Sequence, residues 1–406
     1  MAPHHPGEID ARSQRVTVVG GGVMGAATAW MLARRGAHVV LHERFARGHH
    51  EGASHGETRN FNTAYSSEVY LDLVFRARDL WAELEQESGV QLLDRVGLVN
   101  HGGGAPRWGV TAQRLAARGE AARWMSAAQA QERWPALRFR PHGSQGQDVL
   151  FVPSGARVRA AAALEAFYRG ILAHGGQVRF SSPVDAILPL DGGGVRVQGA
   201  FGTEVSDSVV IAAGAWTSAV AGALVALPDL VVTQEQPAHF GYSELGLALG
   251  LGTDLSGDSD PDGAADLPGF NHSADPDEAA DGYFRSDVYG MRTPGEGIKA
   301  GWHGTGPCTD PDDRSYAPEP DQLADLQRYA SEWIPGARWH EPTPISCTYT
   351  STATTDFILD RVGDVVIGAG FSGHGYKFAP AIGEVLANLA LAVGKPPAGI
   401  FALAGR

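Results

Sequence analysis

Short apolar runs that end in glycine alternate with longer segments of helical periodicity along this chain. Residues 15–19 form a β-branched run that leads into three glycines, and a helical pattern follows over 24–35, where Gly36 can end it. A second apolar run, 37–42, ends at Glu43. This order of strand, turn, helix and strand predicts one βαβ unit.

Helical periodicity recurs in three later segments, 66–87, 160–173 and 321–333. In the first of these, the apolar positions at helical spacing are Tyr70, Leu73, Val74, Ala77, Leu80, Trp81 and Leu84. Two further β-branched runs, 208–214 and 365–370, also end in glycine, and the second leads into a helical pattern that reaches about residue 392.

Strand-like runs that end in glycine thus occur at the start, in the middle and at the end of the chain. The simplest arrangement is an α/β fold, α+β overall, in which one parallel-sheet domain is interrupted by insertions. We expect that discontinuous domain to comprise 15–95, 150–232 and 352–406. The intervening segments, 96–149 and 233–351, then form a second domain.

Two polar segments are expected to lie outside this core. Residues 1–14 are predicted to be a flexible N-terminus. Residues 252–282 hold nine acidic residues and no lysine or arginine, a composition typical of an exposed, mobile loop. A lid over the active site is the alternative interpretation of this acidic loop.

Charge and cysteine content narrow the possible partners. The 406 residues carry a net charge of −14 without a basic run, which argues against nucleic acid or an anionic membrane as a partner. Two cysteines are too few for a disulfide framework. The first dozen residues hold no apolar core of a signal peptide, and no apolar run approaches the roughly 18 residues that span a bilayer. We expect a soluble, cytoplasmic protein.

The glycine turn after the first strand indicates a dinucleotide site. The sequence Gly20-Gly-Gly-Val-Met-Gly25 fits G-x-G-x-x-G between a predicted strand and a predicted helix. Gly20 permits the tight turn, Gly22 lets the backbone approach a pyrophosphate, and Gly25 allows close packing of helix and strand. Glu43 is placed to accept hydrogen bonds from a ribose. The motif does not separate FAD from NAD.

Four motifs together carry a family resemblance. They are the glycine turn, Ala53-Ser-His-Gly-Glu-Thr-Arg59 with Ala64-Tyr65, Ser346-Cys-Thr-Tyr-Thr350, and Gly370-Phe-Ser-Gly-His-Gly-Tyr-Lys-Phe378. With them the chain resembles the monomeric sarcosine oxidase family and its close relative N-methyltryptophan oxidase, of the amino-acid-oxidase superfamily, along nearly its whole length. The resemblance implies a Rossmann-type FAD-binding domain with an inserted, mostly antiparallel β-sheet substrate domain. It also implies a monomer.

The resemblance implies FAD bound covalently, through its 8α-methyl group, to a cysteine at the position of Cys347. A small buried thiol is the alternative, and Cys308, which lacks such a motif, is expected to be structural. Backbone N–H groups of 370–378 could face the polar edge of the flavin. The expected cofactor-binding residues are Gly20, Gly22, Val23, Met24, Gly25, Glu43, Arg44, Ser54, His55, Thr58, Arg59, Val184, Ala213, Gly214, Trp216, Cys347, Gly370, Gly373, His374, Gly375, Tyr376 and Lys377.

The resemblance also assigns catalytic roles. Lys299 matches the lysine that sits over the flavin and promotes reaction with O₂, because a fixed cation stabilises superoxide as it forms. Lys377 matches the lysine that holds the substrate carboxylate. His303 matches an active-site histidine, and His55 and Arg59 belong to the segment beside the flavin. A solvated lysine or a structural histidine is the alternative reading of each.

One position departs from the family pattern. Where sarcosine oxidase has an arginine that clamps the substrate carboxylate, this chain has Asn62. Asparagine cannot form the bidentate charged fork, so a small α-amino acid should lose about 1.5–3 kcal/mol of binding. Arg292 could supply the charge from another side. The expected substrate-binding residues are Asn62, Tyr289, Met291, Arg292, His303 and Lys377, and no metal site is expected.

We therefore expect an FAD-dependent oxidase that acts on the C–N bond of a secondary or tertiary amine, N-methyl or cyclic amino acid-like. Hydride would pass to flavin N5, an imine would form, and O₂ would become H₂O₂. One alternative is a carboxylate-free, Amadori-type or natural-product amine as substrate, which Asn62 makes plausible. A flavin dehydrogenase that uses another electron acceptor and a catalytically idle flavin-binding module are the others.

Overall fold

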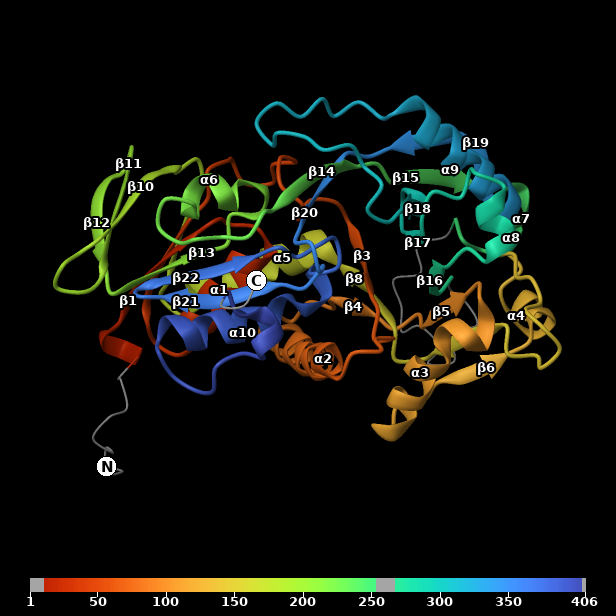
Figure 1. Ribbon diagram of the computed structural model, residues 1–406, viewed down its shortest axis with the longest axis horizontal. Helices are drawn as coiled ribbons and strands as arrows, with labels where there is room; N and C mark the ends of the chain where they lie inside the picture. The colour runs from red at the N-terminus through yellow and green to blue at the C-terminus, as the bar shows by residue number, and fades with distance from the viewer. Residues whose placement is uncertain (1–10, 253–266, 404–406) are drawn as a thin grey trace.

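The computed structural model describes residues 11–252 and 267–403, and a six-stranded sheet forms one end of it (Figure 1). Its strand order is β21-β22-β13-β1-β2-β9. All neighbours are parallel except the edge pair β21–β22. The strands are β1 (Arg15–Val19), β2 (His38–His42), β9 (Gln177–Arg179), β13 (Ser208–Ile211), β21 (Ile358–Val362) and β22 (Val365–Ala369).

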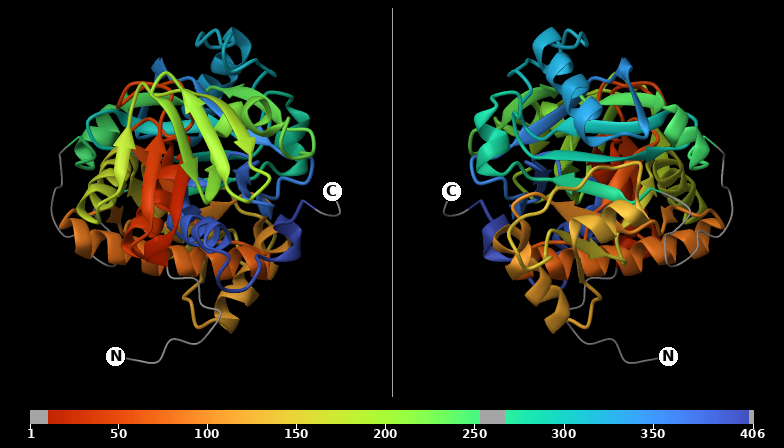
Figure 2. Two further views of the ribbon diagram at one scale, coloured as in Figure 1. Left: turned by 90° about the vertical axis from the view of Figure 1, so that its left-hand side faces the viewer. Right: turned by 90° about the vertical axis from the view of Figure 1, so that its right-hand side faces the viewer.

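Helices cover one face of this sheet and a small sheet covers the other (Figures 1 and 2). The helices are α1 (Val23–Arg34), α2 (Glu68–Ser88), α5 (Ala160–Ala173) and α10 (Ala379–Ala390). On the other face lie β10 (Val184–Pro189), β11 (Val195–Gly199) and β12 (Gly202–Ser206). Side chains alternate along β1, so Val16 and Val18 pack with the helices while Val19 packs with the small sheet.

A second, eight-stranded sheet forms the other end of the molecule (Figure 1). Its order is β19-β15-β18-β17-β16-β5-β7-β6, and every pair is antiparallel except β16–β5. The strands are β5 (Leu98–His101), β6 (Arg123–Met125), β7 (Val149–Val152), β15 (Ala238–Tyr242), β16 (Gly269–His272), β17 (Val288–Thr293), β18 (Gly297–Trp302) and β19 (Ala337–Pro344). The expected fold class, a Rossmann-type parallel sheet with a mostly antiparallel second sheet, is confirmed.

Two small sheets connect the large ones. One is β3-β8-β4 and the other is the pair β14–β20 (Figure 1). Their strands are β3 (Thr58–Phe61), β4 (Leu93–Asp94), β8 (Ala156–Arg159), β14 (Val231–Glu235) and β20 (Cys347–Ser351). The remaining helices are η1 (Ala11–Ser13), α3 (Gly104–Ala117), α4 (Ala127–Arg133), η2 (Gly214–Trp216), α6 (Thr217–Ala221), α7 (Glu244–Ala248), α8 (Pro276–Ala280), α9 (Pro320–Trp333), η3 (Tyr376–Phe378) and η4 (Gly399–Phe401).

One expected boundary differs from the structure, and one expected segment lies mostly outside the described residues. Strand β7 begins at Val149 and belongs to the eight-stranded sheet, although residues from 150 onward were assigned to the parallel-sheet domain. The reason is its pairing with β5 and β6, which a boundary drawn from the sequence pattern cannot detect. Residues 1–10 of the expected flexible N-terminus lie outside the described residues.

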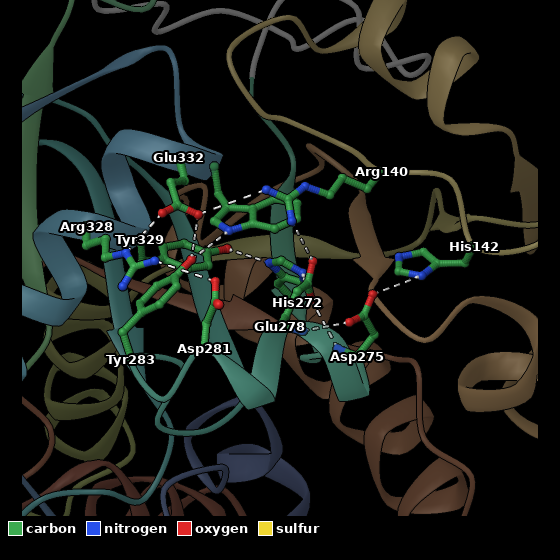
Figure 3. A network of polar contacts seen from close by, with 11 residues as sticks. Arg140, His142, His272, Asp275, Glu278, Asp281, Tyr283, Arg328, Tyr329 and Glu332 are labelled. Atoms are coloured by element: carbon green, nitrogen blue, oxygen red, sulfur yellow. Dashed lines mark hydrogen bonds and ion pairs between the residues drawn. The ribbon is translucent and has the colours of Figure 1, made fainter.

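The acidic segment 252–282 is only partly described, and its second half is not an exposed loop. Residues 253–266 lie outside the described part, whereas β16 is an internal strand of the eight-stranded sheet. Phe270 and His272 are fully buried there, and Glu278 of α8 lies 3.4 Å from His272 Nε2 (Figure 3). The apolar side chains and the pairing with β5 and β17 outweigh the acidic composition, so the expectation of a wholly mobile loop is corrected.

Over the residues that the structure describes, no helix is both long and apolar enough to cross a membrane.

Candidate active site

A cavity of about 1370 Å³ lies between the two large sheets and continues to the carboxyl end of β1. Its walls come from both sheets, from β20 and from the loop between β22 and η3. Ligands of open α/β sheets bind at this end of the strands. The cavity therefore joins the predicted dinucleotide turn to the predicted catalytic residues.

The glycine turn leaves no room for side chains. Gly20 has φ +104° and donates its N–H to the His42 carbonyl oxygen at 2.8 Å. A Cβ at Gly20 would lie 2.4 Å from the Ala212 carbonyl oxygen, and one at Gly25 would lie 1.9 Å from the Gly20 carbonyl oxygen. Gly25 thus lies behind the cavity wall and serves the close helix–strand packing predicted for it.

The N-terminus of α1 faces the cavity. Gly22 is its N-cap, and Val23 N–H donates to Ser54 Oγ at 2.9 Å. Glu43 accepts from Gly21 N–H at 2.7 Å, and Tyr168 OH donates to the Gly21 carbonyl oxygen at 2.6 Å. The helix dipole and the close backbone favour a pyrophosphate here, and the Glu43 carboxylate at the end of β2 suits a ribose. The donor set fits the dinucleotide part of FAD.

Three further expected cofactor residues line the same end of the cavity. They are Val184, Ala213 and Gly214. Beside them, Asp312 joins two more: its Oδ1 lies 2.8 Å from Arg44 Nη1 and accepts from Trp216 Nε1 at 2.8 Å. The expected cofactor residue Thr58 does not line the cavity, because its hydroxyl is buried against Thr293 Oγ1 at 2.7 Å. Only its carbonyl oxygen serves the site, as described for Lys299 below.

The Cys347 thiol lies on the cavity wall. It is a free, half-buried thiol at the start of β20, and its Sγ lies 4.0 Å from the Ala53 carbonyl oxygen.

The glycine-rich segment 370–378 packs closely against its neighbours. A Cβ at Gly373 would lie 2.0 Å from the Tyr349 ring, and one at Gly375 would lie 2.8 Å from Met24 Cε. Substitution at either glycine would force these walls apart. Gly370 lines the cavity in the same segment.

Lys299 projects from β18 into the cavity and is 5% exposed. Its Nζ donates to the Thr58 carbonyl oxygen at 2.7 Å. Burial, and after it the nearby Arg59, lower the pKa of Lys299 to about 7. The side chain therefore holds a cation that neutralises readily near neutral pH.

Lys377, in η3, is the second buried lysine and is 7% exposed. Its Nζ donates to Tyr65 OH at 3.0 Å and to the His374 carbonyl oxygen at 2.7 Å. Burial lowers the pKa of Lys377 to about 7. Burial and Lys377 together lower the pKa of His374 to about 3, so that imidazole is neutral. Tyr376, the neighbour of Lys377, donates its hydroxyl to the Ala160 carbonyl oxygen at 2.7 Å.

Neutral polar groups line the same cavity as the two lysines. His303 Nδ1 lies 3.2 Å from Tyr349 OH, and burial lowers the pKa of His303. Tyr289 and Met291 line the wall from β17. Burial raises the pKa of both Tyr289 and Tyr349, so both phenols keep their protons.

His55 and Arg59 hold the segment that precedes β3 against the cavity. His55 Nδ1 lies 2.7 Å from the Gly52 carbonyl oxygen, and burial lowers the pKa of His55 to about 4. Arg59 donates to the Thr58 carbonyl oxygen at 2.8 Å and to the Ala53 carbonyl oxygen at 3.0 Å. Both side chains line the cavity, and the guanidinium of Arg59 adds positive charge to it.

Of two expected substrate residues, Asn62 lines the cavity and Arg292 does not. Asn62 lines the cavity, but its Oδ1 accepts from Ala64 N–H at 2.7 Å. Arg292 is not part of the wall: it is 2% exposed, and its Nε donates to the Leu251 carbonyl oxygen at 2.9 Å. Successive side chains of β17 point to opposite faces, so when Met291 faces the cavity Arg292 faces away. The expectation that Arg292 supplies charge to the substrate is therefore corrected.

Several wall residues had no predicted role. Tyr168 supports the glycine turn. Tyr65 contacts Lys377, and Tyr349 contacts His303. His239 of β15 is the cross-strand partner of Lys299 of β18. Tyr65 and Tyr349 stand inside motifs that were recognised as wholes, so the signal was present for them. His239 and Tyr168 enter the site only through strand pairing and helix packing, which leave no local pattern.

Comparisons with known proteins agree with this geometry. The model of the DAO family, described as FAD dependent oxidoreductase, matches residues 15–389. Monomeric sarcosine oxidase of Bacillus sp. (strain B-0618) is 29% identical over 386 residues, 93% of this chain and 92% of that protein. N-methyl-L-tryptophan oxidase of Yersinia pestis (strain Pestoides F) is 26% identical over 380 residues, 92% and 94% of the two chains.

Among solved structures, a variant of NikD, described as an unusual amino acid oxidase essential for nikkomycin biosynthesis, superposes with a TM-score of 0.78. It is 22% identical, and the match covers 96% of this chain and 98% of that one, which shows a shared fold. The family model spans both large sheets and the whole cavity. The chain belongs to the DAO family of FAD-dependent oxidoreductases.

Proposed function

We propose that this protein is an FAD-dependent oxidase of a secondary or tertiary amine. One observation carries the proposal: a single cavity joins the glycine turn and Glu43 to the Cys347 thiol and to two buried lysines, Lys299 and Lys377. Relatives of 26–29% identity over most of the chain are named sarcosine oxidase and N-methyl-L-tryptophan oxidase. Bound FAD supplies the hydride acceptor and the electrons for O₂.

The neutral residues that line the cavity with the lysines suit a neutral amine. An amine must lose its ammonium proton before a hydride can leave the adjacent carbon, and a buried pocket disfavours the ammonium form. Tyr289, Tyr349 and the neutral His303 offer such surroundings, with hydrogen-bonding groups that orient the substrate. The protein contributes orientation and exclusion of water.

We assign the two lysines to different half-reactions. Lys377, with Tyr65, is the cation that binds an anionic substrate group. Lys299, on β18 and fixed by the Thr58 carbonyl, is the cation that stabilises negative charge on dioxygen. Both roles depend on the charged form, which the lowered pKa of about 7 makes sensitive to pH.

We also propose that FAD is bound covalently through Cys347. The thiol is free, lies on the cavity wall and occupies the first position of β20, whose partner β14 fixes its backbone. A thioether at this position would draw electron density from the flavin ring. It would also hold the cofactor during turnover.

The substrate class is tested with matched pairs of amines. Sarcosine and N-methylated or cyclic amino acids are compared with the same amines without the carboxylate, and peroxide is measured in air. We expect the acids to be turned over, because Lys377 is a buried cation that an anion can pair with. Asn62, whose oxygen is already bonded to Ala64 N–H, favours weak binding and a large KM. Turnover of the carboxylate-free amines alone would transfer the proposal to larger or neutral natural-product amines.

A further inference from the structure

A polar path leads from the protein surface to Lys299. His239 of β15 and Lys299 of β18 are direct partners across the antiparallel pair, and both line the cavity. Directly opposed residues on one face have Cβ atoms about 5 Å apart. The outer end of the path is Glu296, whose side chain is 41% exposed, in the turn between β17 and β18.

The contacts along this path are short. His239 Nε2 lies 3.1 Å from Glu296 Oε2 and 3.2 Å from Thr293 Oγ1. Thr293 Oγ1 in turn lies 2.7 Å from Thr58 Oγ1, and the Thr58 carbonyl oxygen accepts from Lys299 Nζ. The imidazole of His239 is 10% exposed, so it separates the exposed carboxylate from the buried amine.

The oxygen half-reaction consumes a proton that must reach the buried cavity from solvent. Dioxygen takes up two electrons and two protons to become hydrogen peroxide. A cofactor reduced by hydride transfer would return two electrons and the one proton that the hydride carried, so one further proton must enter from solvent. Lys299 is the cation that the proposed function assigns to the oxygen step, and if it gives up a proton there it must be protonated again before the next turnover.

We propose that Glu296 and His239 form the proton route that recharges Lys299 during the reaction with O₂. Glu296 collects a proton from solvent, and His239 takes it on one ring nitrogen while releasing another toward the cavity. A water molecule in the cavity that both residues line passes the proton to the Lys299 amine. No bond other than N–H and O–H bonds forms or breaks in this sequence, and it ends with the Lys299 ammonium restored.

The charges around the path are consistent with a relay that stays neutral at rest. Burial, Lys299 and Arg59 lower the pKa of His239 to about 3, so His239 does not hold a proton permanently. Burial and Glu57 raise the pKa of Glu296, which makes its carboxyl group a better proton donor near neutral pH. Burial and Arg59 lower the pKa of Lys299, whereas Glu296 and Glu57 raise it. The proposal rests on the proposed function for the identity of the reaction.

The test separates the oxygen step from amine oxidation. The flavin-loaded protein is reduced with dithionite or light, without any amine, and mixed with O₂ in a stopped-flow instrument from pH 6 to 9. We expect His239→Gln and Glu296→Gln each to slow reoxidation about tenfold or more, with a larger solvent isotope effect and partial rescue by added imidazole. The control is Glu341→Gln, an exposed carboxylate on the neighbouring strand β19.

A second readout does not depend on turnover. In ¹⁵N NMR spectra of the oxidised protein, the signal that disappears in His239→Gln should be a neutral imidazole protonated at Nδ1, whose unprotonated Nε2 faces Glu296 and can take up the incoming proton. Glu296→Gln should shift that tautomer. Wild-type reoxidation rates and isotope effects in both variants would overturn the proposal. Failure of every amine to reduce the flavin would overturn the proposed function instead, while the dithionite experiment would still decide the relay.

Discussion

At the scale of single residues, two lysines with the same burial and the same lowered pKa have different surroundings. Lys299 is held by a backbone carbonyl of β3, beside Arg59 and His239. Lys377 is held by a phenol, Tyr65, and by the carbonyl of η3's preceding turn. The surroundings of Lys299 provide a fixed charge and a route to solvent. The surroundings of Lys377 resemble a binding pocket. The two lysines can therefore be tested separately.

Lys299→Met should slow the reaction of the reduced protein with O₂ by about 10²-fold, because one fixed charge is removed from a low-dielectric site. In the wild type this rate should fall as pH rises through about 7, where Lys299 loses its proton, and it should be flat in the variant. Stopped-flow reoxidation measures both. An unchanged rate, or an equal loss in anaerobic reduction by amine, would remove Lys299 from the oxygen step.

Lys377→Met should raise KM for carboxylate-bearing amines by about tenfold to a hundredfold, the loss expected for a hydrogen bond to a charged group. Amines without the carboxylate should keep their KM. The measurement is steady-state peroxide release with both members of each substrate pair. Equal effects on both members would mean that Lys377 supports the pocket rather than binding the acid.

Cys347→Ser should leave FAD bound but removable. We expect acid or denaturant to release the yellow cofactor from the variant and not from the wild type, since Ser cannot form the thioether. Absorbance of the supernatant after precipitation, and the mass of the tryptic peptide that contains residue 347, measure this. Cys308→Ser is the matched control, because Cys308 is exposed and lies outside the cavity wall. Release from the wild type would contradict covalent attachment.

At the scale of elements, strand pairing places groups that the local sequence leaves unexplained. His272 lies on β16, stacked on His101 of β5 at a centroid distance of 4.0 Å. Its Nδ1 lies 3.1 Å from Tyr329 OH (Figure 3). Burial holds the pKa of both His101 and His272 well below the usual value. Glu278 of α8 closes the same network.

This network should make the protein sensitive to acid. Below pH 6.5 the unfolded chain binds a proton at His272 that the folded protein does not. The free energy of unfolding therefore decreases as the pH is lowered, by up to about 1.4 kcal/mol per pH unit. Burial raises the pKa of Glu278, so this carboxyl group changes the free energy of unfolding in the opposite direction as the pH is lowered. Glu278 is present in both the wild type and the His272→Gln variant, so the comparison between them isolates His272. His272→Gln should therefore lose stability less steeply between pH 6.5 and 5 than the wild type. Melting temperatures measured across this pH range give the two slopes. His38→Gln is the control, because His38 is exposed. Equal slopes in the wild type and His272→Gln would contradict the assignment.

The elements themselves could be predicted where periodicity or glycine marked them. The expected helices over 24–35 and 160–173 correspond to α1 and α5 within one residue. The pairing of β7 with β5 and the burial of β16 could not be predicted, because they depend on partners distant in sequence. Arg292 was misplaced because the face of β17 that meets the cavity is set by register, which the sequence of one strand does not reveal.

At the scale of the whole molecule, the cavity exists because two sheets with separate cores meet over β3 and β20. The parallel sheet holds the nucleotide turn, and the antiparallel sheet brings Lys299, Tyr289 and His303 to the same space. The motifs on each side could be recognised from the sequence, and so could the cofactor class. The link between them could not, nor could the path through His239, since it arises only when β15 and β18 pair.

The most direct measurement is an anaerobic titration of the FAD-loaded protein with sarcosine or a cyclic amino acid, followed by air. The account predicts loss of the oxidised flavin absorbance as amine is added. Its return on aeration should come with one H₂O₂ per flavin. If no secondary or tertiary amine bleaches the flavin while dithionite does, the proposed oxidase activity is contradicted. Bleaching by amine without peroxide on aeration would instead identify a dehydrogenase.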